Sequence, residues 1–190
     1  MGHLGSDGRP FAREELERLE RALFLLTRTI SEQPPARLDV HLLKDWHRQL
    51  SADHPRMTPG MFRSGDITFG TFYGAPPAFI ESQTRQLLSD VEDQIGDLDL
   101  RTHSEPQTRL FDAVVALGCT LHVSLIRIHP FVDGNGRLSR LAHLWVHRRF
   151  GYKPPAFTDR ASYLAALNRA LYRGELDLIK LLTLKAVQDC

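Results

Sequence analysis

His129-Pro130-Phe131-Val132-Asp133-Gly134-Asn135-Gly136-Arg137 is the stretch that decides the interpretation of this 190-residue chain. An apolar run over residues 121–128 precedes it and predicts the end of a buried helix. Pro130 disfavours helical backbone for the residue before it, so this helix should stop near His129. A second helix should begin near Asn135, because apolar residues recur at helical spacing between positions 138 and 145. The stretch is therefore expected to be a loop between two helices.

The loop carries groups suited to proton transfer and anion binding. His129 has a side chain whose ordinary pKa suits a general base near neutral pH. Gly134 and Gly136 permit backbone conformations that other residues avoid, and they let a ligand approach the main chain closely. The free N–H groups at the start of the second helix form an anion site. Arg137 and Arg140, three residues apart, share one face of that helix.

Asp133 is the one acidic residue between Arg127 and Arg149, a segment with five arginines and a net charge of +4. A lone carboxylate beside a phosphate site suits Mg²⁺, which takes one or two carboxylates together with phosphate oxygens. The parts together predict a phosphate-centred transfer onto a hydroxyl group. A simple turn would explain the Asp-Gly and Asn-Gly pairs, but it would leave His129, Arg137 and Arg140 unexplained.

Residues 129–137 resemble the Fic signature, the HPFx(D/E)GN(G/K)R loop of the Fic/Doc family, at every specified position. Arg140 matches a further arginine often found one turn later. A second resemblance runs from Gly60-Met61-Phe62-Arg63 to Pro76-Pro77. It is similar to the flap of the family, which lies over the active site and aligns the backbone of a target protein by strand addition. The resemblance covers roughly residues 38–189 and leaves the first helix outside.

The resemblance implies transfer of AMP from ATP to a Ser, Thr or Tyr hydroxyl of a target protein. His129 would take the proton from the attacking hydroxyl, and Asp133 would hold Mg²⁺. The backbone N–H groups of residues 134–136 would bind the phosphates, with the Asn135 side chain at the α-phosphate.

The same resemblance assigns the remaining site residues. Arg137 and Arg140 would take the β- and γ-phosphates. Four flap residues are candidates for the wall of the nucleotide or target groove: Phe69, Thr71, Phe72 and Tyr73.

Three alternative functions stay open. Doc-type kinases place a lysine where Gly136 stands, and Gly136 favours nucleotidyl transfer by keeping the phosphate site open. The base pocket is not readable from the sequence, so UMP or phosphocholine transfer is also compatible. A protein of another class, an inactive Fic-like binding module, would keep the loop without the reaction; labelling by ATP with Mg²⁺ distinguishes it.

The family resemblance also leads to expectations about regulation and cellular location. No (S/T)xxxE(G/N) inhibitory motif occurs in the chain, which suggests a separate small antitoxin-like inhibitor and a bacterial, toxin-like role. The net charge of +1 gives no case for binding nucleic acid. No apolar run suggests a membrane span, and two cysteines suggest no disulfide framework. The expected location is the cytoplasm, or the cytoplasm of a cell into which the protein is delivered.

The expected fold is all-α, a Fic-type helical domain over residues 11–190 with a small β-hairpin flap, after a flexible lead-in at residues 1–10. A flap over residues 60–77 is expected to contain strands at 66–69 and 71–73, divided by Gly70. Thr158 should cap the sixth of seven helices. The expected helices are 11–30, 39–50, 79–95, 108–128, 135–150, one that begins after residue 158, and one around 176–184.

Other histidines are poor candidates for metal ligands. His143 and His147 lie four residues apart on one helix, but Leu144 stands where a zinc-peptidase motif has glutamate. His122 could join them only through the fold, so a zinc site is not expected. His41, His47 and His54 are interpreted as surface or packing residues.

Overall fold

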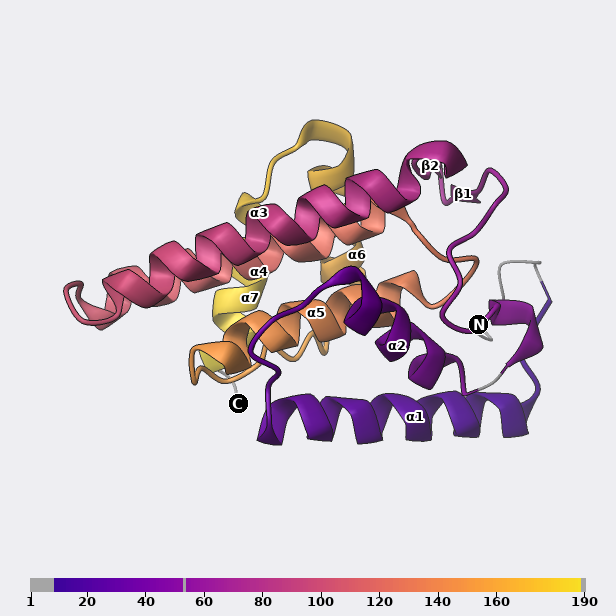
Figure 1. Ribbon diagram of the computed structural model, residues 1–190, viewed down its shortest axis with the longest axis horizontal. Coiled ribbons are helices and arrows are strands. Elements are labelled where there is room, and N and C mark those ends of the chain that lie inside the picture. The colour runs from indigo at the N-terminus through magenta and orange to yellow at the C-terminus, as the bar shows by residue number, and fades with distance from the viewer. Residues whose placement is uncertain (1–8, 53, 189–190) are drawn as a thin grey trace.

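A computed structural model describes residues 9–52 and 54–188, and it confirms an all-α domain with one small hairpin (Figure 1). Most of the predicted lead-in, residues 1–8, lies outside the described residues. The elements are α1 (Arg13–Glu32), α2 (Val40–Ser51), β1 (Thr68–Phe69), β2 (Phe72–Tyr73), α3 (Ile80–Arg101), α4 (Gln107–Ile128), α5 (Asn135–Arg149), α6 (Arg160–Arg173) and α7 (Asp177–Gln188), with short 3-10 turns η1 (Pro55–Met57) and η2 (Pro77–Phe79).

The centre of the domain is α4, which packs most extensively on α5 and also touches α3, α6 and α7. Its apolar residues are buried on both sides, against α3 and α5 in one core and against α6 and α7 in a second. The helix is long and apolar enough to cross a membrane by length and composition alone. Packing inside the domain accounts for that composition, because the core helix of a globular domain is apolar all round.

Helix α1 lies along one side of the domain and contacts α2 and α5 (Figure 1). Its apolar stripe, Leu19, Leu26 and Ile30, is buried. The end of the helix is tied to α5, since the guanidinium of Arg148 donates two hydrogen bonds to the Ser31 carbonyl at 2.9 and 2.7 Å. The Trp145 indole donates to the Pro35 carbonyl at 2.8 Å just beyond. Helix α1 is therefore an integral wall of the domain.

Two predicted boundaries were wrong. Helix α3 continues to Arg101, past the connection expected at Gly96. Leu98 extends the buried stripe of Val91 and Ile95, and this burial outweighs the roughly 1 kcal/mol that a glycine costs inside a helix. The cap of α6 is Asp159 rather than Thr158, because the Asp159 carboxylate accepts hydrogen bonds from two backbone N–H groups of the first turn.

The hairpin is antiparallel, with Thr68 opposite Tyr73 and Phe69 opposite Phe72. The strands are shorter than expected, and Gly70 turns the chain between them with φ +58°, a value that suits glycine. The hairpin lies at the end of the domain where α4 stops and α5 starts (Figure 1). The flap and the signature loop are therefore neighbours.

Candidate active site

Helix α4 ends at Ile128, and His129 takes a left-handed backbone conformation with φ +52°. A residue other than glycine rarely adopts this conformation, and such residues cluster at functional sites. The ring of His129 is oriented by its Nδ1, which lies 3.1 Å from the Ile126 carbonyl oxygen. A carbonyl can only accept, so Nδ1 carries the proton and Nε2 keeps its lone pair. The histidine is thus prepared to accept a proton at Nε2.

Phe69 from the flap stacks on the His129 ring, with centroids 4.0 Å apart and planes 10° from parallel. Burial is the main cause that lowers the pKa of His129 to about 4. The charge of Arg63 adds to this shift, while the hydrogen bond to Ile126 and the charge of Asp133 oppose it. The imidazole is consequently neutral at physiological pH, which is the form that a base requires.

The flap stem is fixed to the loop by Arg63, which is 5% exposed. Its guanidinium donates to four main-chain carbonyls: His129 at 2.7 Å, Ile128 at 3.2 Å, Gly65 at 2.7 Å and Ala75 at 2.6 Å. The first two lie at the carboxyl end of α4, where a cation also suits the helix dipole. Arg63 therefore joins both sides of the flap to the backbone of His129.

The start of α5, where the sequence predicts an anion site, has unpaired backbone N–H groups. Gly134 precedes the helix with φ +81°, and a Cβ there would lie 2.9 Å from Met57 Cε. Its own N–H donates to the Asp133 carboxylate at 2.5 Å, which takes it out of the expected phosphate contacts. The N–H groups of residues 135–137 have no acceptor within the helix, because they belong to its first turn. These three groups, rather than those of 134–136, are placed to bind an anion.

Asn135 differs from the sequence expectation. Its amide is buried and bonds to Phe131 at both ends, with Phe131 N donating to Oδ1 at 3.0 Å and Nδ2 donating to the Phe131 carbonyl at 2.8 Å. The side chain thus fixes the shape of the loop, and the residue also lines the cleft. Phe131 itself is fully buried, as a plug that anchors the loop in the core.

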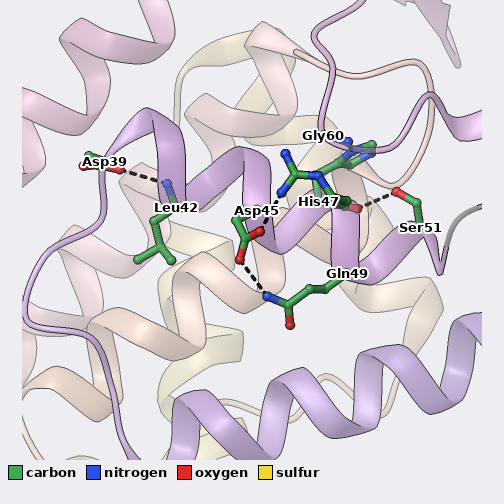
Figure 2. Close-up of polar contacts among 8 residues, drawn as sticks. Asp39, Leu42, Asp45, His47, Gln49, Ser51 and Gly60 are labelled. Carbon is green, nitrogen blue, oxygen red and sulfur yellow. Dashed lines mark hydrogen bonds and ion pairs between the residues drawn. The ribbon is translucent and has the colours of Figure 1, made fainter.

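His47 on α2 is a supporting residue that the sequence did not single out from other packing histidines. Its ring stacks on Phe131 with centroids 3.7 Å apart. Nδ1 accepts from the Gly60 N–H at 3.0 Å (Figure 2). Nε2 therefore carries the proton and donates to the Asp133 carbonyl at 3.0 Å. One neutral imidazole therefore connects α2, the base of the flap and the signature loop. His47 lies far from the loop in the sequence, so no sequence pattern indicated this role.

A cleft of about 670 Å³ opens over the loop and contains His129, Asp133, Arg137 and Arg140 together. Arg137 lies 3.7 Å from the Asp133 carboxylate. The cleft has two further walls that the sequence did not predict. Arg160 comes from the start of α6, and an apolar wall comes from Phe11 and α1 through Leu16, Leu19 and Leu23, with Glu20 beside them. The first helix, which lies outside the family resemblance, is part of the site.

The four flap candidates divide into three groups. Phe69 lines the cleft. Thr71 and Phe72 face α6, where the Thr71 hydroxyl bonds to the Tyr172 hydroxyl and the Phe72 and Tyr172 ring centroids are 4.4 Å apart. Tyr73 is 80% exposed. The hairpin tip is thereby fastened to the end of α6, and one aromatic ring points to solvent.

Within the described residues, no group of three histidine, cysteine or acidic side chains is arranged to hold a metal ion. The fold does bring His122, His143 and His147 together in the core, all fully buried. His122 lies on α4, and His143 and His147 lie on α5; none of the three lines the cleft. For Mg²⁺ bound with a nucleotide, Asp133 is a fitting ligand, since one carboxylate and phosphate oxygens suffice.

Comparison with known proteins matches the part of the chain that contains the loop. The family model described as Fic/DOC family matches residues 37–146. Protein adenylyltransferase fic-1 of Caenorhabditis elegans is 28% identical over 155 residues, which are 80% of this chain and 28% of the relative. A uridine 5'-monophosphate transferase of Xanthomonas campestris pv. campestris (strain 8004) is 41% identical over 66 residues, 34% of this chain and 12% of that protein. This chain therefore spans only a fraction of the length of the relatives that it matches.

Solved structures share the fold. Fic-1 (residues 134–508) of C. elegans superposes with a TM-score of 0.69 at 21% identity and covers 92% of this chain and 48% of its own. BepC, a VirB-translocated effector of Bartonella tribocorum solved with bound AMPPNP, has a TM-score of 0.67 at 17% identity and covers 98% of this chain and 92% of its own. These likenesses establish the arrangement of helices around the loop.

Proposed function

This chain belongs to the Fic/DOC family, and from that premise we propose that it transfers AMP from ATP to a hydroxyl group of a target protein. The observation that carries the proposal is the state of His129. Its Nδ1 is engaged by a carbonyl, its Nε2 is left to accept a proton, and it shares a cleft with a helix N-terminus and Arg137 and Arg140. Two relatives from nematodes are named protein adenylyltransferases, which supports the same reaction.

In the proposed reaction, His129 Nε2 takes the proton from a Ser, Thr or Tyr hydroxyl of the target. The hydroxyl oxygen attacks the α-phosphorus, the new O–P bond forms, and the bond between the α-phosphorus and the bridging oxygen breaks. Pyrophosphate leaves with the negative charge. The N–H groups of residues 135–137 stabilise charge on the phosphates, and the protein contributes mainly position and electrostatics.

Two residues and a metal complete the proposed phosphate site. Arg137 and Arg140 take the β- and γ-phosphates, where their charge offsets that of the leaving group. Asp133 would hold Mg²⁺, which when bound supplies a Lewis acid to the phosphate oxygens. The Asp133 backbone is bound by His47, and the residue lines the cleft.

The target protein is proposed to bind along the hairpin by strand addition, past Phe69 and Tyr73. Its hydroxyl would then meet His129 under the flap. A small inhibitor protein is a second proposed partner, since the chain lacks the (S/T)xxxE(G/N) motif. We also propose an intracellular location, because the reaction consumes ATP.

The test uses ATP labelled at the α- or the γ-phosphate, with Mg²⁺ and a cell lysate, and compares the wild-type chain with His129→Ala. Label from the α-position in protein bands, lost in His129→Ala, supports AMP transfer. Label from the γ-position alone would indicate a kinase instead of an AMP transferase. His129→Ala that labels as fast as the wild type would refute the assignment of the base.

UMP transfer is a second candidate, favoured by the uridine 5'-monophosphate transferase that is 41% identical over 66 residues. The same assay with α-labelled UTP decides between the donors. A rate from UTP above that from ATP at equal concentration would establish the second candidate.

A further inference from the structure

Behind the cleft, three helices meet at a buried polar contact. The Tyr163 hydroxyl on α6 lies 2.9 Å from Nε2 of His122 on α4. Tyr163 is 7% exposed and His122 is not exposed at all. The guanidinium carbon of Arg140 on α5 lies 6.0 Å from the centre of the Tyr163 ring. A phenol and an imidazole inside the core thus adjoin an arginine of the phosphate site.

The direction of each hydrogen bond follows from the donors available. The charge of Arg140 and its hydrogen-bonding contribution oppose the rise in the Tyr163 pKa that burial causes, so the guanidinium faces the hydroxyl oxygen. Arginine can only donate, so the hydroxyl oxygen presents a lone pair to it. The hydroxyl proton is then directed to Nε2 of His122, which must be unprotonated there. The remaining proton of His122 lies on Nδ1, which has no hydrogen-bond partner among the described residues.

The contacts of Arg140 differ from those of Arg137. Arg137 faces the carboxylate of Asp133, whereas no ion pair joins Arg140 to an acidic side chain of residues 9–52 and 54–188. A carboxylate would orient Arg140 and also compete with a phosphate for it. A neutral phenol orients the guanidinium and leaves its positive charge intact.

We propose that Tyr163, supported by His122, is a positioning residue that holds Arg140 toward the terminal phosphates of the nucleotide. The inference rests on the proposed function, in which Arg140 contacts the β- and γ-phosphates. The Tyr163–His122 pair then contributes to the affinity for a triphosphate and not to the affinity for a nucleotide that lacks those phosphates. The Tyr163–His122 pair therefore lets the site distinguish a nucleoside triphosphate from nucleotides with fewer phosphates.

The test measures the dissociation constants of MgATP and AMP for the full chain by calorimetry. Tyr163→Phe keeps the ring and removes the hydroxyl, and it is expected to weaken MgATP binding roughly fivefold to tenfold while AMP binding changes less than twofold. Tyr152→Phe is the matched control, because it also removes a hydroxyl with one hydrogen bond, to Gln107 at 3.2 Å. The control is expected to bind both nucleotides as the wild type does.

Two further variants separate positioning from packing. In an Arg140→Ala background, Tyr163→Phe is expected to have no additional effect on MgATP binding, since there is no guanidinium to position. His122→Gln retains an acceptor for the Tyr163 hydroxyl and is expected to bind MgATP more tightly than His122→Leu does. Thermal unfolding of each variant establishes that it is folded.

The outcomes are distinct. A Tyr163→Phe variant that binds MgATP as the wild type does would overturn the inference and leave the proposed function standing. Equal weakening of MgATP and AMP, or a further loss in the Arg140→Ala background, would show a general packing role and overturn it as well. A wild-type chain that binds no MgATP and transfers no nucleotide would refute the proposed function and the inference together.

Discussion

The main-chain carbonyl of His129 accepts a hydrogen bond of 2.7 Å from Nε of Arg63, so the proposed base and the flap stem form one rigid unit. The same guanidinium binds Gly65 and Ala75 on the two sides of the flap. A displacement of the flap would therefore be transmitted directly to the backbone of His129, which already occupies a conformation that few residues tolerate.

Arg63→Lys is expected to reduce the transfer rate at least tenfold, because an ammonium group cannot reach four carbonyls arranged around a planar fork. Buried carbonyls left without donors cost about 1–3 kcal/mol each, so the free energy of unfolding should also fall. Single-turnover kinetics and urea denaturation measure the two effects. Arg28→Lys, in an exposed ion pair with Glu32, is the control and should change neither. Wild-type kinetics in Arg63→Lys would show that the flap and the base are independent.

The pH dependence of transfer should reflect the lowered pKa of His129, about 4. A histidine with the ordinary pKa of about 6.5 would be roughly nine-tenths protonated at pH 5.5 and inactive as a base. His129 should still be neutral at that pH, so kcat/KM is expected to be nearly constant between pH 5.5 and 7.5 and to fall only toward pH 4. Circular dichroism at each pH verifies that the protein is folded. An acid limb centred near pH 6.5 would contradict the burial of the base.

Five histidines with lowered pKa values predict that the domain is labile in acid. Their pKa values are lowered by burial when folded and return to about 6.5 on unfolding, so the unfolded chain binds more protons between pH 6.5 and pH 4. The stability that these neutral histidines contribute is complete above pH 6.5 and is lost as the pH falls toward 4, by up to about 1.4 kcal/mol per pH unit for each. They are His47, His122, His129, His143 and His147.

Urea denaturation at pH 7 and pH 5 measures this effect. His143 has no hydrogen-bond partner at either ring nitrogen among the described residues, so His143→Leu should flatten the pH dependence by about one proton without losing a bond. Exposed His103→Leu should leave the slope unchanged. Equal slopes for the wild type and His143→Leu would mean that this ring is protonated in the folded state.

Two glycines with similar backbones provide a matched test of the loop. Gly134 and Gly151 have φ of +81° and +75°, so alanine at either position incurs a strain of roughly 1 kcal/mol. At Gly151 nothing lies within 4 Å of an added Cβ, whereas at Gly134 the Cβ would meet Met57 Cε at 2.9 Å and His47 Nε2 at 3.3 Å. Gly134→Ala should therefore lose at least about 1 kcal/mol more stability than Gly151→Ala, and only Gly134→Ala should slow transfer. Equal losses would show that the loop has room at this position.

The parts of the site that are local in sequence were predictable. The end of α4 at His129 and the start of α5 at Asn135 follow from Pro130 and from helical periodicity, and both are confirmed. The hairpin divided at Gly70 is also confirmed, because turn chemistry and β-branched residues lie within a few positions of each other.

Contacts between distant segments could not be predicted. His47 reaches Asp133 across 86 positions, and no pattern near His47 distinguishes it from His41, which is exposed. The two hydrogen bonds of the Asn135 amide to the Phe131 backbone were not predicted, because a single sequence does not show which backbone groups a buried amide will reach. Arg160 and the wall from α1 enter the cleft only through the packing of helices.

The contribution of α1 to the cleft bears on how the protein is divided and redesigned. The family match begins at residue 37, after α1 has ended, so a fragment cut at that boundary would retain every residue of the loop and lose the side of the cleft formed by Leu16, Leu19 and Leu23. In such a fragment the cleft would be open on the side that α1 covers. Conversely, substitutions on that face of α1 can reshape what the cleft accepts while residues 129–137 stay untouched, which makes the helix the natural place for engineering a new nucleotide preference.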